Sequence, residues 1–309
     1  MLYLTESDVL KLLPMSECLP LMRTAFERLA AGEAINQPRR RLTLPTKSTL
    51  HYMVGSDGRY FGAKVYSTNP GHKPHFLALL YRAEDAELLA VIEANHLGQI
   101  RTGAVSGYAT QLLARPDSRT LGLIGSGFQA RTQVEAIRAA LPSVDTIRVW
   151  SRSAEKRDAF ARQCGVEAAD TAEQAVRGAD IVVTATNSGE PVLESDWIAP
   201  GTHINAMGSN QARRRELPAE LVRRAGLIVA DSVEQSRMES GDLLLAFTSD
   251  NDWERVVELK DVTSGRSARK RPDEITLFKS NGLAVEDVIA AGWVFERAQD
   301  SGAGRPIYS

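Results

Sequence analysis

The sequence predicts an α/β protein that combines a doubly wound parallel sheet with a mostly antiparallel α+β part. Three observations carry this prediction. A glycine-rich turn at residues 125–130 joins an apolar run to a helical stretch, and apolar runs alternate with helical segments from residue 120 to residue 231. Strand-like runs dominate residues 39–93. Alternating strands and helices are typical of a parallel sheet with helices on both faces, whereas consecutive strands are typical of antiparallel sheets.

The amino-terminal part is expected to begin with helices. Thr5–Asp8 has the pattern of a helix capping box. A longer helix, which ends at Gly32, places on one face Cys18, Leu21, Met22, Ala25, Phe26 and Leu29. We expect strands at 41–44, 49–53, 60–65, 76–81 and 88–92, followed by a helix at 97–114. The segment 115–118, which contains Pro116, breaks that helix and predicts a domain boundary.

Beyond this boundary we expect strands at 120–124, 146–150, 166–169, 181–185, 202–206 and 227–231, with helical segments between them. Six such strands complete a Rossmann sheet, so the NAD(P)-binding domain is predicted to cover residues 115–280. An amphipathic helix at 283–299 follows, and the six-stranded sheet is complete without it. We therefore expect residues 281–309 to return to the first domain, which would consist of 1–114 plus 281–309.

The composition excludes several classes of protein. The chain has 309 residues, of which 43% are hydrophobic and 25% charged, with a net charge of −2. This balance does not indicate disorder or a basic surface for nucleic acid. No apolar run approaches the roughly 20 residues of a transmembrane helix, and the amino end is acidic, so we expect a cytoplasmic protein with no membrane partner. Neither the spacing of Cys18 and Cys164 nor that of His72 and His75 completes a ligand set, and no metal site is expected.

The most informative motif is the turn Gly125-Ser126-Gly127-Phe128-Gln129-Ala130. In a dinucleotide-binding turn the first glycine permits a tight bend, the second lets the backbone approach the pyrophosphate, and the small third residue lets helix and strand pack closely. Glycine pairs in ordinary turns produce such a string by chance. Here strand, turn and helix arrive in the required order, which favours the cofactor interpretation.

The end of the next strand predicts which dinucleotide is bound. NAD-specific folds place an acidic residue there to bind the ribose 2′-OH, but this chain has Ser151, Arg152 and Ser153. Arg152 could instead pair with a 2′-phosphate, flanked by two hydroxyl donors. NADP(H) is therefore the preferred cofactor, with NAD(H) possible. The alternative is that Arg152 is a solvated arginine at the start of the helix at 153–163.

Two further strand ends are small and polar, and they suit a nicotinamide carboxamide and ribose. Strand ends of a parallel sheet lie at the edge where ligands bind. The residues expected to contact cofactor there are Thr184, Ala185 and Thr186 after one strand, and Met207, Gly208 and Ser209 after another. Each segment alone could be an ordinary turn, but their recurrence on successive strands favours a binding role.

The first domain carries basic residues among apolar neighbours, namely Arg41, Lys64 and Arg101. Buried cations need anionic partners. A substrate carboxylate is one candidate partner and an internal Asp or Glu is the other. Spacing alone leaves both alternatives open.

Taken together, these motifs resemble the ornithine cyclodeaminase/mu-crystallin family over essentially the whole chain. The resemblance rests on Lys64, Gln99–Ser106, Leu113–Pro116, Leu121–Ala130, Ala179–Thr186, Pro200–Gly208, Arg215–Leu217, Asp231–Ser232 and Thr276–Asp287. It implies a Rossmann-type doubly wound parallel sheet inserted in an α+β substrate-binding and dimerisation domain. It also implies a homodimer formed through the amino-terminal domain, and a small amino or imino acid as substrate.

The resemblance further implies roles for individual residues. Those matching Arg41, Lys64 and Arg101 hold the substrate carboxylate, and Lys64 is the first catalytic candidate. Two departures argue against ornithine cyclodeaminase itself: Asn210 stands where that enzyme has the aspartate that meets the distal amine, and His51 replaces a glutamate. Asn210 is kept as a substrate-binding candidate. His51 is a weaker catalytic candidate, because the ordinary pKa of histidine suits acid catalysis near neutral pH.

The expected activity is therefore NADPH-dependent reduction of the C=N bond of a 2-imino acid, as in a ketimine reductase or a Δ1-pyrroline-2-carboxylate reductase. One alternative is an ornithine cyclodeaminase or an amino-acid dehydrogenase of the alanine-dehydrogenase type, using NAD. Another is an NADPH-dependent binding protein for a small ligand, like mu-crystallin.

Overall fold

The computed structural model describes residues 1–307, which form two compact units. The first unit contains residues 1–101 and the chain from Gly282 onward, and the second contains Thr102–Asn281. The boundary between them lies within helix α3 (Asn95–Leu113). No helix in the described part of the chain is both long and apolar enough to cross a membrane.

The first unit is built on an eight-stranded sheet. Its strands are β1 (Leu2–Leu4), β2 (Ile35–Asn36), β3 (Arg40–Thr43), β4 (Thr49–Ser56), β5 (Tyr60–Thr68), β6 (Phe76–Arg82), β7 (Leu88–Glu93) and β16 (Arg305–Pro306). The order is β16-β1-β7-β6-β5-β4-β2, with β3 paired on β4. Only the β1–β7 pair is parallel among these strands, so the mostly antiparallel character expected for this part is confirmed.

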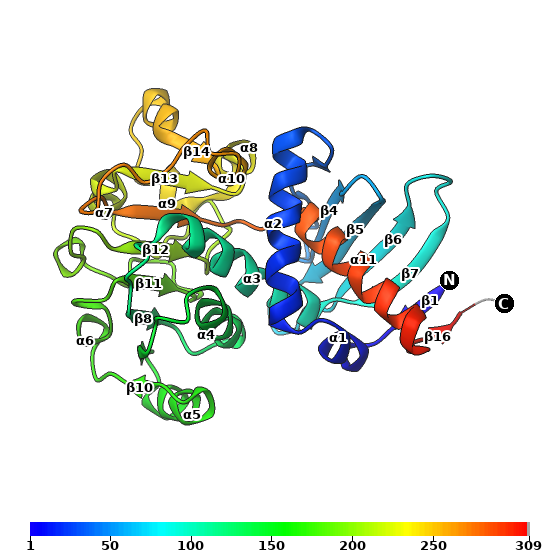
Figure 1. Ribbon diagram of the computed structural model, residues 1–309, viewed down its shortest axis with the longest axis horizontal. Coiled ribbons are helices and arrows are strands. Elements are labelled where there is room, and N and C mark those ends of the chain that lie inside the picture. The colour runs from blue at the N-terminus through cyan, green and yellow to red at the C-terminus, as the bar shows by residue number, and fades with distance from the viewer. Residues whose placement is uncertain (308–309) are drawn as a thin grey trace. The chain divides into compact units, whose positions relative to one another are not determined.

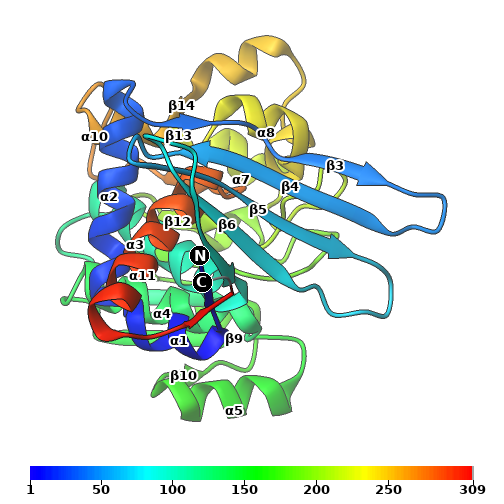
Figure 2. The same cartoon turned by 90° about the vertical axis from the view of Figure 1, so that its right-hand side faces the viewer.

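Three helices accompany this sheet: α1 (Glu6–Leu12), α2 (Met15–Ala31) and α11 (Ala284–Ser301). Helix α11 packs against β4, β5 and β6, and α2 packs against α11 (Figures 1 and 2). The side chain of Asn36 in β2 caps α11, because its Oδ1 accepts hydrogen bonds from the backbone N–H of Ala284 at 2.7 Å and of Val285 at 3.3 Å. The carboxyl-terminal helix is therefore part of the first unit.

The two faces of this sheet differ. One face meets α11, and the register places His51 opposite Tyr66 and Met53 opposite Lys64 on that face. The other face keeps large apolar side chains exposed, which are Ile35, Leu42, Leu50, Tyr52, Phe61 and Leu77. A sheet of a monomer normally exposes polar residues on its free face, so an apolar face of this kind is unusual for a monomer.

The second unit contains a second eight-stranded sheet, and all its strand pairs are parallel. Its strands are β8 (Thr120–Ile124), β9 (Thr146–Trp150), β10 (Glu167–Ala168), β11 (Ile181–Thr184), β12 (His203–Ala206), β13 (Leu227–Ala230), β14 (Val256–Glu258) and β15 (Thr276–Lys279). The order is β10-β9-β8-β11-β12-β15-β13-β14. The predicted doubly wound parallel sheet is confirmed.

The helices between these strands are α4 (Phe128–Ala140), α5 (Ala154–Cys164), α6 (Ala172–Val176), α7 (Ala219–Arg224), α8 (Val233–Glu239), α9 (Gly241–Leu244) and α10 (Leu259–Thr263). Two short 3-10 helices, η1 (Ser195–Trp197) and η2 (Asp250–Arg255), complete the unit.

The expectation that six strands complete the second sheet is wrong. Strands β14 and β15 add to it, and β15 lies between β12 and β13. Its four residues are fully buried, but they end in Lys279 and are flanked by charged and polar residues. A buried strand of this length has no alternating pattern to reveal it, which explains why it was not predicted.

Candidate functional site

A pocket of about 960 Å³ lies in the second unit at the carboxyl ends of β8, β9, β11 and β12. The strand order reverses between β8 and β11, and such a reversal creates the crevice in which doubly wound folds bind ligands. The predicted cofactor residues that line this pocket are Gly125, Ser126, Gly127, Phe128, Gln129, Ser151, Arg152, Ser153, Ala185, Thr186 and Gly208.

The glycine-rich turn has the geometry that a pyrophosphate requires. Gly125 has φ +119°, and a Cβ atom there would lie 2.5 Å from the carbonyl oxygen of Ala185. At Gly127 a Cβ would meet open space, and this residue begins α4 without a side-chain cap. The first turn of α4 can therefore offer backbone N–H groups to an anion, as in other phosphate sites at helix N-termini.

The other side of the pocket near β9 is polar and basic. Ser126 Oγ donates a hydrogen bond of 2.8 Å to Ser151 Oγ, which joins the glycine-rich turn to the end of β9. Ser153 caps α5 by accepting a hydrogen bond from the backbone N–H of Lys156 at 3.3 Å. Arg152 is exposed and lines the pocket together with Lys156. Lys156 was not predicted, although its place in the first turn after the Ser-Arg-Ser segment was a usable signal.

Some predicted cofactor residues do not line this pocket. Ala130 is buried at the start of α4, where it serves packing, and Thr184 donates its hydroxyl to Glu216 at 2.9 Å. Met207 and Ser209 are also buried, and Asn210 is half-buried in the same segment. Their proposed contacts with cofactor or substrate stay predictions.

A charged cluster lies in the first unit, between the sheet, α3 and α11. Lys64 Nζ in β5 lies 2.6 Å from Asp287 Oδ2 in α11. Arg101 donates from Nε to Asp287 Oδ1 at 2.8 Å and from Nη1 to Glu286 Oε2 at 2.6 Å. All four side chains are at most 6% exposed. Lys64 and Arg101 therefore have the internal acidic partners that the sequence left as one of two alternatives.

The acidic partners were not predicted as site residues. Glu286 and Asp287 lie in the otherwise apolar first part of α11, and two adjacent acids among buried apolar residues are the signal that could have identified them. Arg39, also unpredicted, is only 4% exposed. Its positive charge acts on Lys64 together with that of Arg101.

The environment of Lys64 makes it a weaker base than usual. Burial lowers its pKa to about 8, and the nearby charges of Arg101 and Arg39 act in the same direction. Asp287 opposes them and raises the pKa. Lys64 consequently carries a proton at neutral pH but can release it at little cost, which suits a proton donor.

His51 lies on the same face of the sheet as Lys64. Its ring stacks on Tyr66 with 4.4 Å between centroids, and its Nε2 lies 2.9 Å from Thr68 Oγ1. Partial burial and the charges of Arg41 and Arg39 lower its pKa to about 4. His51 is thus a neutral imidazole near pH 7, and the argument for acid catalysis from its ordinary pKa does not hold.

The expectation that Arg41 is a buried cation is wrong. It belongs to β3, which pairs only with β4 and whose four residues are all exposed. An edge strand leaves such side chains in solvent. Arg41 nevertheless pairs in register with His51, so both lie on the face that carries Lys64.

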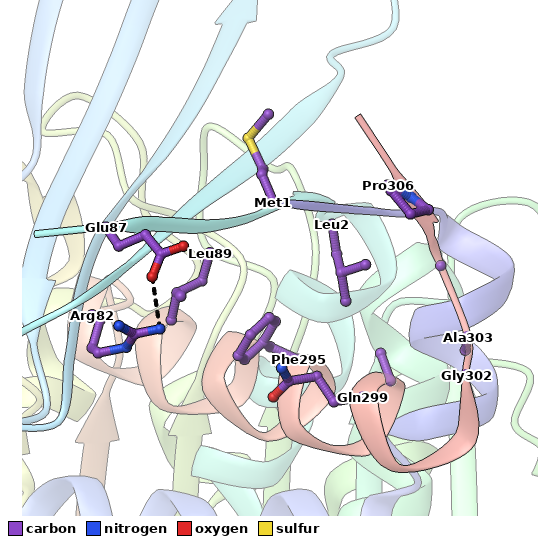
Figure 3. A pocket seen from close by; sticks show the side chains of 12 residues that line it. Met1, Leu2, Arg82, Glu87, Leu89, Phe295, Gln299, Gly302, Ala303 and Pro306 are labelled. Atoms are coloured by element: carbon purple, nitrogen blue, oxygen red, sulfur yellow. Dashed lines mark ion pairs between the residues drawn. The ribbon is translucent and has the colours of Figure 1, made fainter. Parts of the chain in front are cut away.

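Another pocket, of about 520 Å³, lies in the first unit near the carboxyl end of α11 (Figure 3). It is lined by residues that include Leu2, Leu89, Phe295 and Pro306, and by the exposed Arg82–Glu87 ion pair of 2.7 Å. The described residues that line it include none of the predicted site residues. It is not a candidate for the predicted chemistry.

The parallel sheet and its glycine-rich pocket define a dinucleotide-binding protein of the Rossmann type. The chain belongs to the ornithine cyclodeaminase/mu-crystallin family, whose model matches residues 1–302.

Three similar proteins illustrate this membership. Delta(1)-pyrroline-2-carboxylate reductase from Bacillus cereus is 33% identical over 325 residues, which cover 99% of each chain. The structure of the Thermococcus litoralis reductase of the same name, in complex with NADH and L-proline, has a TM-score of 0.92 and 33% identity, with 99% of this chain and 100% of that chain covered. An archaeal alanine dehydrogenase dimer with bound NAD has a TM-score of 0.93 and 31% identity, with 100% and 99% covered.

Proposed function

We propose that this protein is an NADPH-dependent reductase of the C=N bond of a cyclic 2-imino acid, with Δ1-pyrroline-2-carboxylate as the first candidate substrate. The observation that carries this proposal is the buried Lys64, paired with Asp287 and surrounded by Arg101 and Arg39. Buried guanidinium groups suit a substrate carboxylate, and a lysine with a pKa of about 8 suits a proton donor. The similarity to reductases of this substrate supports the choice.

The reaction needs a hydride on the imine carbon and a proton on the imine nitrogen. A bound nicotinamide cofactor supplies the hydride. In our proposal Lys64 Nζ holds the proton and donates it to the nitrogen, while Asp287 fixes the ammonium group in place. Arg41 and Arg101 bind the carboxylate and so orient the C=N bond. His51, a neutral imidazole at pH 7, can contribute a hydrogen bond but no positive charge.

We propose NADP(H) as the preferred cofactor. Arg152 and Lys156 both line the pocket beside the end of β9, where a ribose 2′-phosphate would lie. A guanidinium and an ammonium favour the doubly charged phosphate over a hydroxyl. The similar structures hold NADH and NAD, so the preference rests on these two side chains.

We also propose that residues 1–114 and 281–309 form the substrate-binding and dimerisation domain, and that the exposed apolar face of its sheet binds the same face of a second copy. Leu42, Leu50 and Ile35 are between 42% and 63% exposed on this face. Burying such residues on both partners is the usual basis of an isologous dimer interface. The archaeal alanine dehydrogenase is itself a dimer.

Amino-acid dehydrogenation is the second candidate, because the structural similarity to alanine dehydrogenase is as high as that to the reductase. The same residues would then act in the reverse direction, with Lys64 taking a proton from the amine. The neutral His51 and Asn210 make the binding of a second substrate ammonium less favourable, which counts against ornithine as substrate.

The test is a steady-state assay of cofactor oxidation at 340 nm with the full-length protein. The substrates are Δ1-pyrroline-2-carboxylate, Δ1-piperideine-2-carboxylate, and pyruvate with ammonia, each with NADPH and with NADH. Faster turnover of a cyclic imine with NADPH supports the proposal. Turnover of pyruvate and ammonia alone favours the dehydrogenase. Proline and ammonia formed from ornithine and NAD would identify a cyclodeaminase, and cofactor binding without turnover of any substrate would favour a carrier.

A further inference from the structure

Three charged residues of the second unit are fully buried although none of them lines the pocket. They are Glu216, which precedes Leu217 in the segment after β12, Asp242 in α9, and Lys279 at the end of β15. Burying ionised groups is costly unless each is paired and hydrogen-bonded. Their contacts show what this arrangement holds together.

Glu216 joins two segments that leave neighbouring strands. Its carboxylate accepts hydrogen bonds from Thr184 Oγ1 at 2.9 Å and from the backbone N–H of Thr186 at 2.7 Å, both after or at the end of β11. It also accepts one from the backbone N–H of Gly208 at 2.8 Å, after β12. Thr186 and Gly208 line the cofactor pocket. One buried carboxylate therefore fixes two parts of the pocket wall.

The absence of a side chain at Gly208 is part of the same arrangement. A Cβ atom at this position would lie 2.1 Å from the carbonyl oxygen of Thr186 and 2.4 Å from Glu216 Oε1. The two segments can thus approach each other closely only because residue 208 is a glycine. Their spacing is then maintained by the carboxylate between them.

Asp242 and Lys279 bind the backbone on either side of the contact between Glu216 and Gly208. Asp242 Oδ1 accepts hydrogen bonds from the backbone N–H of Glu216 at 2.6 Å and of Leu217 at 3.0 Å. Lys279 Nζ lies 3.2 Å from Asp242 Oδ2 and donates to the carbonyl oxygens of Ser209 at 2.5 Å and Ala206 at 3.3 Å. The ion pair therefore binds the same segment after β12 that Glu216 binds.

The strand order indicates which half of a dinucleotide this wall would contact. Strands β9 and β12 lie on opposite sides of β8, whose turn suits the pyrophosphate. The adenosine half of a dinucleotide lies toward the strand that carries the 2′-contact, here β9 with Arg152. The segments after β11 and β12 are then beside the nicotinamide half.

We propose that Glu216 is a positioning residue that holds the nicotinamide side of the cofactor pocket in its binding geometry, with Asp242 and Lys279 as its supports. This inference rests on the proposed binding of NADP(H). It deepens that proposal by separating two halves of the pocket. The adenosine half depends on Arg152 and the glycine-rich turn, and the nicotinamide half depends on a buried carboxylate.

The test compares Glu216→Gln with the wild-type protein by isothermal titration calorimetry, using NADPH and adenosine 2′,5′-bisphosphate as ligands. The glutamine keeps the size of the side chain but replaces one acceptor by an NH₂ group, so either Thr186 or Gly208 loses its partner. We expect the affinity for NADPH to fall about tenfold or more. The affinity for adenosine 2′,5′-bisphosphate should stay within about twofold, because that ligand lacks the nicotinamide half.

Glu274→Gln is the matched control. Glu274 is also a buried carboxylate of the second unit that accepts a backbone hydrogen bond, from Lys270 at 2.8 Å, but it does not line the pocket or contact its wall segments. Both affinities should be unchanged in this variant. Thr184→Val removes a single donor to Glu216 at nearly constant shape, and should weaken NADPH binding about threefold. Thr184→Val therefore provides a second test of the positioning role if Glu216→Gln does not fold.

The outcomes separate the two proposals. Unchanged NADPH affinity in Glu216→Gln, or an equal loss for both ligands, would overturn the positioning role. In the same way, Thr184→Val with wild-type NADPH affinity would count against it. If the wild-type protein bound neither ligand, the proposed cofactor itself would be refuted and this inference with it.

Discussion

Replacing Asp287 by asparagine tests how the charged cluster of the first unit determines the pKa of Lys64, the proposed proton donor. Asp287 is the group that raises the pKa of Lys64 against burial, Arg101 and Arg39, and the result is a pKa of about 8. His51 and Arg41 lie on the same face of the sheet, and Glu286 adjoins on α11. All of these groups remain in Asp287→Asn. Only the negative charge 2.6 Å from Lys64 Nζ is lost.

Loss of an adjacent opposite charge shifts a pKa by about one to three units, here downward. A shift of about 1.5 units would lower the protonated fraction of Lys64 at pH 7.5 from about three quarters to about one tenth, which is about eightfold. Protonated Lys64 is the active form in our proposal. Activity is therefore retained below the pKa of Lys64 and lost above it, and the variant should lose activity at a lower pH than the wild type.

The assay is the pH dependence of kcat/KM for imine reduction with NADPH, which reports ionisations of the free enzyme. The descending limb, near pH 8 in the wild type, should move to lower pH in Asp287→Asn, and activity should partly recover in acid. Glu286→Gln is the matched control, because this neighbouring buried carboxylate pairs with Arg101. Its descending limb should stay within about half a unit of the wild type. An Asp287→Asn profile that keeps the wild-type limb at uniformly lower rate would refute the reasoning.

Three other changes test the remaining proposals. Lys64→Ala should lower kcat about 100-fold or more while the Kd for NADPH, from calorimetry, stays within about threefold; an equal loss of both would indicate a structural lysine. Arg152→Asp should lower the ratio of kcat/KM for NADPH to that for NADH by about tenfold or more, and an unchanged ratio would contradict the assignment of the 2′-phosphate site. Leu50→Glu, on the exposed apolar face, should convert a dimer to monomers in light scattering, whereas a dimer of wild-type affinity would point to another interface.

Much of the second unit could be predicted because its signals are local. The strands at 120–124 and 146–150 and the turn between β8 and α4 combine short apolar runs with glycines, and local sequence determines such features. Strand β15 could not be predicted in the same way. Its four buried residues acquire meaning only when they pair with β12 and β13, which are distant in the sequence.

The charged cluster could be predicted only in part, for a related reason. The sequence identifies Lys64 and Arg101 as cations that need partners, but Asp287 is 186 residues from Arg101. The pKa of His51 depends on burial and on the charges of Arg41 and Arg39, which no pattern along the chain describes. The roles of Arg41, His51 and Asn210, and the domain limits 1–114 and 281–309, stay predictions.

The cap that Asn36 places on α11 links the beginning of the chain to its end, and this has a consequence for biosynthesis. All strands of the parallel sheet lie between residues 120 and 279, so they are synthesised after Asn36 and before the segment that Asn36 caps. The antiparallel sheet lacks its covering helix until residues 284–301 emerge. Its face with Lys64 therefore stays without α11 until the whole parallel sheet has been synthesised, so the amino-terminal segment is made first but completes its fold last.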